Sequence, residues 1–340
     1  MTTPTRCANT LPGVSTASSP TGPIFCSRCW EEAVSNLTKR PSRPLTGILP
    51  GLALLLCVGL SLAAVWFSQQ GSSPIKIERD ISYGLVDGQP LLLDTYSIPW
   101  QPGQPQRAAL IFIHGGGFAA GDKQDFDFLA KGLAAEGYIT FSINYRLVKD
   151  KANKYPAQLD DVQRAVRWVR SQAEEYHLNP SRLCAIGGSA GGHLASMLGT
   201  TDTRDNSDPT LSAYSSRVTC VVALYAPQDL TVPLSIETGA EAAVLNLIGQ
   251  SREAAFEKFR EASPLYHIDQ FTAPFLIFHG TLDPLVPVDQ AQQFHAALQT
   301  AGVSSELILF EGEGHSIEKP ENIQIFSERL RAFLQKQLGQ

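Results

Sequence analysis

The sequence has no surplus of positive charge. Its 27 Lys and Arg residues stand against 33 Asp and Glu residues, which gives a formal net charge of −6. Surfaces that bind nucleic acid need clustered cations, often interleaved with aromatic residues, and no long run of that kind occurs. The composition therefore argues against a nucleic acid as partner and favours chemistry on a small molecule.

Cysteine is scarce beyond residue 75. Of the six cysteines in the chain, only Cys184 and Cys220 lie there, so no disulfide framework is expected. Both fall in apolar runs, where the expected role is that of a small buried apolar side chain. Cys26 and Cys29 form one C-x-x-C pair, but neither a second pair nor a suitably spaced pair of histidines follows. The pattern therefore gives little support for a zinc site.

Charged residues are absent from residues 44–75. Within this segment, residues 48–67 are almost wholly apolar, about the length that a helix needs to cross a bilayer. A buried core helix of this length would normally carry a polar stripe, and none is visible. We therefore expect a flexible tail over residues 1–43, a transmembrane anchor over residues 44–68 and a linker over residues 69–75.

Positive charge ahead of this apolar segment sets its expected orientation. Lys39, Arg40 and Arg43 lie directly upstream, whereas the Lys and Arg residues directly downstream are balanced by Asp and Glu. This bias favours an amino terminus in the cytoplasm and a single-pass protein whose bulk lies on the non-cytoplasmic side. The small-x-small pattern at residues 61–63 leaves a cleaved signal peptide, and hence a secreted protein, as the alternative.

From residue 76 onward, short apolar runs alternate with helical patterns. Residues 159–169, for example, repeat apolar side chains at helical spacing. Continuous apolar runs suit strands that are covered on both faces, so the alternation predicts a mostly parallel, doubly wound sheet. A hairpin-like pair near residues 80–94 predicts antiparallel edge strands. The apolar runs lie at residues 91–93, 108–113, 138–143, 183–186, 218–224, 275–278 and 307–310.

Residues with catalytic chemistry follow directly after four of these runs. In an open α/β sheet, ligands bind beyond the carboxyl ends of the strands, so these positions are expected to meet at one edge. They are His114-Gly115-Gly116-Gly117-Phe118, Gly187-Gly188-Ser189-Ala190-Gly191, His279-Gly280-Thr281-Leu282-Asp283 and Glu311-Gly312-Glu313-Gly314-His315.

Ser189 is the candidate nucleophile. It stands in a G-x-S-x-G pentapeptide between an apolar run and a helix-compatible stretch, where a sharp turn would present its hydroxyl. A hydroxyl needs a base, and His315 is the candidate because an imidazole titrates near neutral pH. Asp283 is the candidate acid that orients the histidine, with Asp229 and Asp289 as weaker substitutes.

Backbone amides are the candidate oxyanion site. The amides of Gly115, Gly116 and Ala190 would stabilise the negative charge that develops on a carbonyl oxygen. Histidine and backbone amides together supply the acid–base chemistry and the charge stabilisation, so we expect no metal and no organic cofactor. His114, His193 and His279 are expected to be structural residues, whereas Glu311 and Glu313 are expected to be solvated.

Taken together, these motifs resemble the α/β-hydrolase superfamily. Within it they are similar to carboxylesterases with an HGGG motif, including hormone-sensitive-lipase-like and bacterial feruloyl- or acetyl-esterase-like enzymes. The resemblance covers residues 81–334 and includes four further motifs, Asn144-Tyr145-Arg146-Leu147, Tyr155-Pro156-Ala157 with Asp161, Ala262-Ser263-Pro264 and Val286-Pro287.

The resemblance implies an α/β-hydrolase fold with a mostly parallel eight-stranded sheet. The catalytic domain would span residues 76–340, and an insertion at about residues 228–271 would form a small helical cap over the acyl pocket. The resemblance also implies a supporting contact between Tyr145-Arg146 and Asp161, for which a solvated salt bridge is the ordinary alternative. Aromatic side chains near the glycine motif are candidates to line the pocket, namely Phe118, Phe126 and Phe128.

The function implied by the resemblance is hydrolysis of carboxylic esters, either short-chain or aryl, through a Ser-His-Asp acyl-enzyme. The expected partners are a small ester as substrate and a membrane through the amino-terminal helix. An amidase or peptidase, such as a formamidase or a prolyl-oligopeptidase-like enzyme, would use the same triad and stays open. A catalytically silent binding module is a further alternative, although the chain keeps every residue type that the reaction needs.

Overall fold

The computed structural model describes residues 74–339. The predicted tail, the predicted anchor or signal peptide, nearly all of the linker, Cys26 and Cys29 lie outside the described residues. Within the described part, no helix has both the length and the apolar character needed to cross a membrane.

In chain order the elements are β1 (Lys76–Val86), β2 (Gln89–Ser97), β3 (Arg107–Ile113), η1 (Lys123–Phe126), α3 (Asp127–Ala135), β4 (Ile139–Ile143), α4 (Ala157–Ser171), β5 (Leu178–Gly188), α5 (Ala190–Thr200), β6 (Cys220–Leu224), α6 (Ala240–Ile248), α7 (Arg252–Glu261), η2 (Pro264–His267), β7 (Phe275–Gly280), α8 (Asp289–Thr300), β8 (Ser305–Phe310) and α9 (Pro320–Leu338).

The strands form one eight-stranded sheet in the order β1-β2-β4-β3-β5-β6-β7-β8. β2 runs antiparallel to β1 and to β4, whereas the pairs from β4 to β8 are parallel. Asp87 and Gly88 form the β1-β2 turn with φ angles of 50° and 76°. The mostly parallel sheet and the antiparallel hairpin predicted from the sequence are both confirmed.

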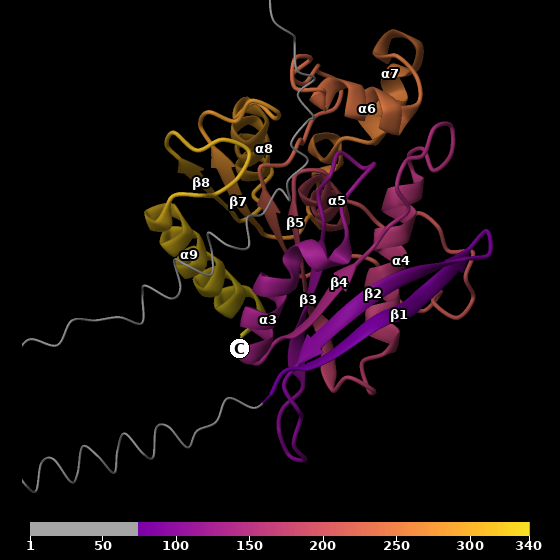
Figure 1. The fold of residues 1–340 in the computed structure, drawn as a ribbon, viewed down its shortest axis with the longest axis vertical. Helices are drawn as coiled ribbons and strands as arrows, with labels where there is room; N and C mark the ends of the chain where they lie inside the picture. The colour runs from indigo at the N-terminus through magenta and orange to yellow at the C-terminus, as the bar shows by residue number, and fades with distance from the viewer. Residues whose placement is uncertain (1–73, 340) are drawn as a thin grey trace, which may run out of the picture.

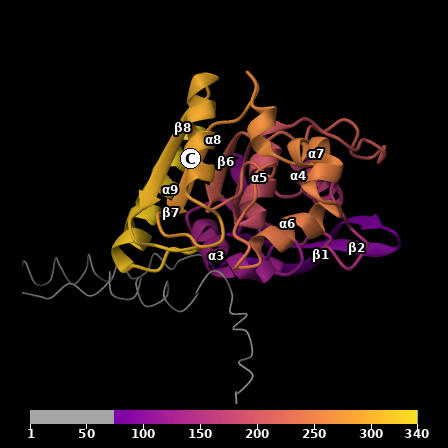
Figure 2. The same cartoon turned by 90° about the horizontal axis from the view of Figure 1, so that it is seen from above.

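Helices cover both faces of the sheet, as the continuous apolar strands require. Along β3, Ile111 and Ile113 belong to a core shared with α4, α5 and α8, whereas Leu110 and Phe112 belong to a second core shared with α3 and α9. Neighbouring side chains of a strand point to opposite faces, so each strand contributes to both cores. Seen from above, α9 and α4 lie on opposite sides of the molecule (Figure 2).

The predicted cap segment leaves the sheet after β6. It contains α6 and α7, close to the helical patterns seen in the sequence at residues 242–248 and 252–260. Figure 1 shows the two helices side by side at the end of the molecule toward which β7 and β8 point. The carboxyl ends of the parallel strands lie at that edge of the sheet. The predicted cap segment therefore lies on the side where the catalytic motifs are expected.

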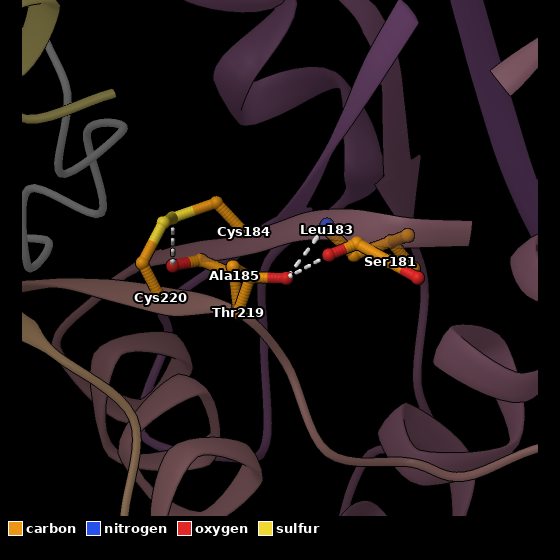
Figure 3. Close-up of a disulfide and its surroundings, with 6 residues drawn as sticks. All are labelled: Ser181, Leu183, Cys184, Ala185, Thr219 and Cys220. Atoms are coloured by element: carbon orange, nitrogen blue, oxygen red, sulfur yellow. Dashed lines mark hydrogen bonds between the residues drawn. A yellow bond between two sulfur atoms is a disulfide. The ribbon is translucent and has the colours of Figure 1, made fainter. Parts of the chain in front are cut away.

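Cys184 and Cys220 form a disulfide, and the expected absence of one is wrong (Figure 3). Their burial is confirmed, because neither side chain is exposed. The cause is strand register: Cys184 of β5 lies directly opposite Cys220 of β6, with their Cα atoms 4.7 Å apart. That separation lies within the range that a disulfide spans. Residues 36 apart in sequence show no such pairing until the register is known.

Candidate active site

Ser189 occupies a sharp turn between β5 and α5. Its backbone has a φ of 54° and a ψ of −122°, a strained conformation for a residue with a side chain. A hydrogen bond attaches this turn to β6, because the Ser189 amide donates to the carbonyl oxygen of Leu224 at 2.9 Å. The strand, turn and helix predicted around the G-x-S-x-G sequence are thus all present.

Gly191 lets the start of α5 pack directly on β3. A methyl group added at Gly191 would overlap the carbonyl oxygens of Ile113 and His114. Gly191→Ala is therefore expected to lower the free energy of unfolding by roughly 1–3 kcal/mol or more, as in other overpacked sites. Gly132→Ala in α3 is the matched control, since nothing lies within 4 Å of the added methyl group. Thermal or urea unfolding of both variants tests this expectation, and equal stability of the two would contradict it.

Three side chains from the ends of three strands form one hydrogen-bonded chain. Ser189 Oγ lies 2.8 Å from His315 Nε2, and His315 Nδ1 lies 2.7 Å from Asp283 Oδ2. A carboxylate can only accept, so Nδ1 carries the hydrogen and Nε2 is free to accept from the serine hydroxyl. The structure thus brings together the three residues that the sequence proposed as nucleophile, base and acid.

The Asp283 carboxylate is fully buried and stays ionised. Its other oxygen, Oδ1, accepts hydrogen bonds from the amides of Leu285 at 2.8 Å and Val286 at 3.0 Å. Burial alone would raise the pKa of Asp283, but hydrogen bonds from His279 and His315 outweigh it and hold the pKa well below its usual range. A negative charge beside His315 stabilises the imidazolium that forms when the base takes up a proton.

The glycine loop after β3 lies beside Ser189. A methyl group added at Gly115 would lie 3.4 Å from the Ser189 Cβ. Gly116 has a φ of 100°, a conformation that a residue with a side chain rarely adopts. Within residues 74–339, no hydrogen bond uses the amides of Gly115 and Gly116, and the Ala190 amide is the first of α5, where a helix offers no acceptor. All three predicted donors are thus free to bind an oxyanion.

Glu313 holds the loop that carries His315, and the expectation that it is solvated is wrong. It is 4 % exposed, and its Oε1 accepts from the Lys319 amide and from Asn322 Nδ2, both at 2.8 Å. Lys319 and Asn322 lie at the start of α9, so this carboxylate fixes the base loop to the helix that follows. Glu311 is exposed, as expected.

Tyr225 lies against His315, although the sequence analysis did not single it out. It follows β6 with a φ of 40°, and the centre of its ring is 4.8 Å from that of the His315 imidazole. Its hydroxyl also lies beside Gly188, because a methyl group there would be 3.1 Å from Oη. Burial raises the pKa of Tyr225 well above its usual value, so the phenol stays neutral. Its place directly after an apolar run was the signal that could have found it.

Other predicted residues lie where packing rather than chemistry requires them. His193 is fully buried and Nε2 donates to the Ala262 carbonyl oxygen at 2.7 Å. The predicted contact of Arg146 is confirmed and is not solvated, because Asp161 is 1 % exposed and accepts from the Arg146 amide and guanidinium. Neither substitute acid contacts His315: Asp229 binds Thr231, and Asp289 is exposed at the start of α8.

Two of the three candidate pocket aromatics pack on the face of the sheet that α3 and α9 cover. Phe126 is buried in the core that α3 and α9 cover, and Phe128 is a half-buried residue of α3 that packs against this core, so the expectation that they line the pocket is wrong. Phe118 is 2 % exposed and packs its ring edge-on against His193, beneath the glycine loop. Above this loop lies α6, since a methyl group added at Gly117 would be 3.3 Å from the Ala243 Cβ.

Comparison with known proteins agrees with this geometry. The BD-FAE family model matches residues 93–298. The probable carboxylic ester hydrolase LipM of Mycobacterium tuberculosis is 34% identical over 223 residues, which cover 64% of this chain and 50% of LipM. Esterase LipC of the same organism is 30% identical over 246 residues, which cover 71% of this chain and 60% of LipC. The matched part of the chain thus spans about half to three fifths of these relatives.

Solved structures share the fold. Thermogutta terrifontis esterase 2 phosphorylated by paraoxon is similar with a TM-score of 0.64 and 28% identity, covering 76% of this chain and 94% of that chain. A truncated carbohydrate esterase from gut microbiota has a TM-score of 0.67 at 23% identity and covers 79% of this chain and 99% of that chain, which supports the fold alone. The predicted α/β-hydrolase fold is confirmed. Because the family model matches more than half of its residues, the chain belongs to the BD-FAE family of α/β-hydrolase-type esterases.

Proposed function

We propose that this protein is a serine hydrolase that cleaves small carboxylic esters through an acyl-enzyme. The observation that carries the proposal is the hydrogen-bonded chain from Ser189 through His315 to Asp283, which ends beside three unused backbone amides. A serine with a histidine base, a buried acid and adjacent amide donors is the arrangement that acyl transfer requires. The esterase names of the curated relatives support the same reaction class.

The proposed mechanism gives each step to a named atom. Ser189 Oγ attacks the ester carbonyl carbon while His315 Nε2 takes the hydroxyl proton, and the amides of Gly115, Gly116 and Ala190 bind the resulting oxyanion. Collapse of this intermediate breaks the bond to the alcohol oxygen, which receives the proton from His315. Water then attacks the acyl-enzyme by the same route, which releases the carboxylic acid and regenerates the serine. Asp283 stays ionised throughout and balances the imidazolium charge.

A panel of chromogenic substrates tests the reaction class. The full chain in detergent is expected to hydrolyse p-nitrophenyl acetate and p-nitrophenyl butyrate, and to act on the matching p-nitroanilides at least about 10²-fold more slowly, because an amide has a poorer leaving group. Preference for the anilides would support the amidase alternative instead. Paraoxon, which phosphorylates a solved relative, is expected to inactivate the enzyme with one equivalent bound at Ser189. Failure of Ser189 to react would favour a silent binding module.

We also propose that the enzyme is tethered to a membrane and that residues 76–340 lie on its non-cytoplasmic side. The uncharged segment at residues 44–75 and the basic residues directly before it support this proposal. The Cys184–Cys220 disulfide adds a separate argument, since disulfides persist in oxidising compartments and are rare in the cytosol. Protease added to intact cells is expected to digest the membrane-bound domain, whereas digestion only after lysis would refute this orientation. Activity found in the medium alone would favour the cleaved signal peptide.

A further inference from the structure

The acid of the triad contacts a second histidine. His279 is on β7, four residues before Asp283, and neither side chain is exposed. Its Nε2 lies 3.3 Å from Asp283 Oδ2, the same oxygen that accepts from His315. We propose that His279 is a positioning residue, which holds the Asp283 carboxylate in the orientation that serves the base. The proposal rests on the serine-hydrolase function proposed above.

The hydrogen bonds of His279 fix its tautomer. Nε2 lies 2.9 Å from the carbonyl oxygen of Val286. A carbonyl oxygen can only accept, so Nε2 carries the hydrogen and directs it toward Val286 and, at longer distance, toward Asp283. The other ring nitrogen, Nδ1, is buried and has no hydrogen-bond partner among residues 74–339. A buried polar atom without a partner destabilises the fold, so an apolar side chain would serve packing better than this histidine.

His279 also bonds the turn whose amides bind the Asp283 carboxylate. Asp283 Oδ1 accepts from the amides of Leu285 and Val286, and the carbonyl of the same Val286 accepts from His279. One oxygen of the carboxylate is therefore fixed by the turn, and the other by two imidazole rings. Removal of the Nε2 hydrogen would free the Val286 carbonyl and leave Oδ2 held by His315 alone. The carboxylate could then rotate, and the histidine base would lose its alignment with Ser189.

The electrostatics agree with this geometry. After the opposing effect of burial, the hydrogen bond from His279 is the largest influence on the Asp283 pKa, followed by that from His315, and both lower it. A carboxylate that stays ionised and in place preserves the interaction on which the imidazolium depends. The contribution of His279 is thus to the alignment and charge of the acid, and it does not involve contact with the substrate.

A pair of substitutions separates this role from packing. Glutamine can place its side-chain nitrogen close to the position of His279 Nε2, whereas leucine fills similar space without a donor. His279→Leu is expected to lower kcat about 10- to 100-fold with KM within about 2-fold, because small misalignments of catalytic groups have effects of this size. His279→Gln is expected to retain kcat within about 3-fold of the unaltered enzyme. Both are assayed as the full chain on p-nitrophenyl butyrate, with active sites counted by a fluorophosphonate probe.

His193→Leu is the matched control. Like His279, His193 is fully buried and bonds a backbone carbonyl through Nε2, and its Nδ1 has no hydrogen-bond partner in the part of the chain that the structure describes. His193 has no hydrogen bond or ring contact with Asp283 or His315 in that part. Its kcat per labelled site is expected to stay within about 3-fold of the unaltered enzyme even if its melting temperature falls. Equal kcat values for His279→Leu and His279→Gln would overturn the positioning role. No activity in the unaltered enzyme would instead overturn the proposed function, and the role of His279 with it.

Discussion

Replacement of Ser189 by alanine is expected to lower kcat for p-nitrophenyl butyrate by at least about 10³-fold, because triad residues act as a unit and removal of the nucleophile leaves only binding and oxyanion stabilisation. The hydroxyl is the group that His315 Nε2 contacts, at 2.8 Å. Without it, His315 can at best activate a water molecule, which the turn does not position. KM is expected to change little, since alanine leaves the shape of the surroundings intact.

Ser196→Ala provides the control for the serine substitution. Ser196 is buried in α5, the helix that follows Ser189, where its hydroxyl donates to the Gly192 carbonyl and accepts from Gln228. Its loss is expected to cost stability, about 1 kcal/mol, and to leave kcat within a few-fold of the unaltered enzyme. Turnover in Ser189→Ala comparable with that of the control would rule out the serine mechanism. The melting temperatures of both variants show whether any loss of turnover comes from unfolding.

Asp283→Asn is expected to lower kcat about 10³- to 10⁴-fold, although it changes the side-chain volume very little. Two amides donate to Oδ1, so the oxygen of the asparagine must take that place. Its NH₂ group then faces His315 Nδ1 at the position of Oδ2 and donates to it. His315 is thereby forced to carry its proton on Nε2, where it cannot accept the proton of Ser189. The same NH₂ group also faces the Nε2 hydrogen of His279, a repulsion that adds to the loss.

The rate at which a fluorophosphonate probe labels Ser189 measures the same loss directly, without the deacylation and product-release steps that contribute to kcat. Asp289→Asn is the control, since this residue is exposed at the first position of α8. Its labelling rate is expected to equal that of the unaltered enzyme. If Asp283→Asn labels as quickly as Asp289→Asn, the acid of the triad must be sought elsewhere, and Asp229 would be the next residue to replace.

The candidate site was predictable because each of its side chains directly follows an apolar run. Ser189, Asp283 and His315 are far apart in sequence, but parallel strands bring their carboxyl ends to one edge, so position at a strand end was sufficient to group them. The same rule would have included Tyr225, and it did place His279 in one of the four motifs, where a structural role was expected. Position at a strand end does not predict the individual contacts between these side chains. Those contacts depend on how β6, β7 and their neighbours pair and on the path of each loop.

The wrong expectations share a cause, which is that the local sequence does not reveal which distant segments meet in the fold. Phe126 and Phe128 come soon after the glycine loop, yet the chain has by then crossed to the face of the sheet that α3 covers. Glu313 lies near His315 in a polar loop, but it is buried because the start of α9 packs over it and Asn322 of that helix donates to its carboxylate. The Cys184–Cys220 disulfide likewise required the register of β5 against β6. Each of these features depends on a contact between segments that no local pattern encodes.

The disulfide gives the polypeptide a closed covalent ring that begins in β5 and ends in β6. Within that ring, residues 201–219 form neither helix nor strand, and residues 201–210 are all exposed or half-buried. A protease cut there would divide the backbone into two polypeptides, one with Ser189 and the oxyanion loop, the other with Asp283 and His315. The bond between Cys184 and Cys220 would keep both halves in one molecule, so that a two-chain form of the enzyme would still hold a complete triad.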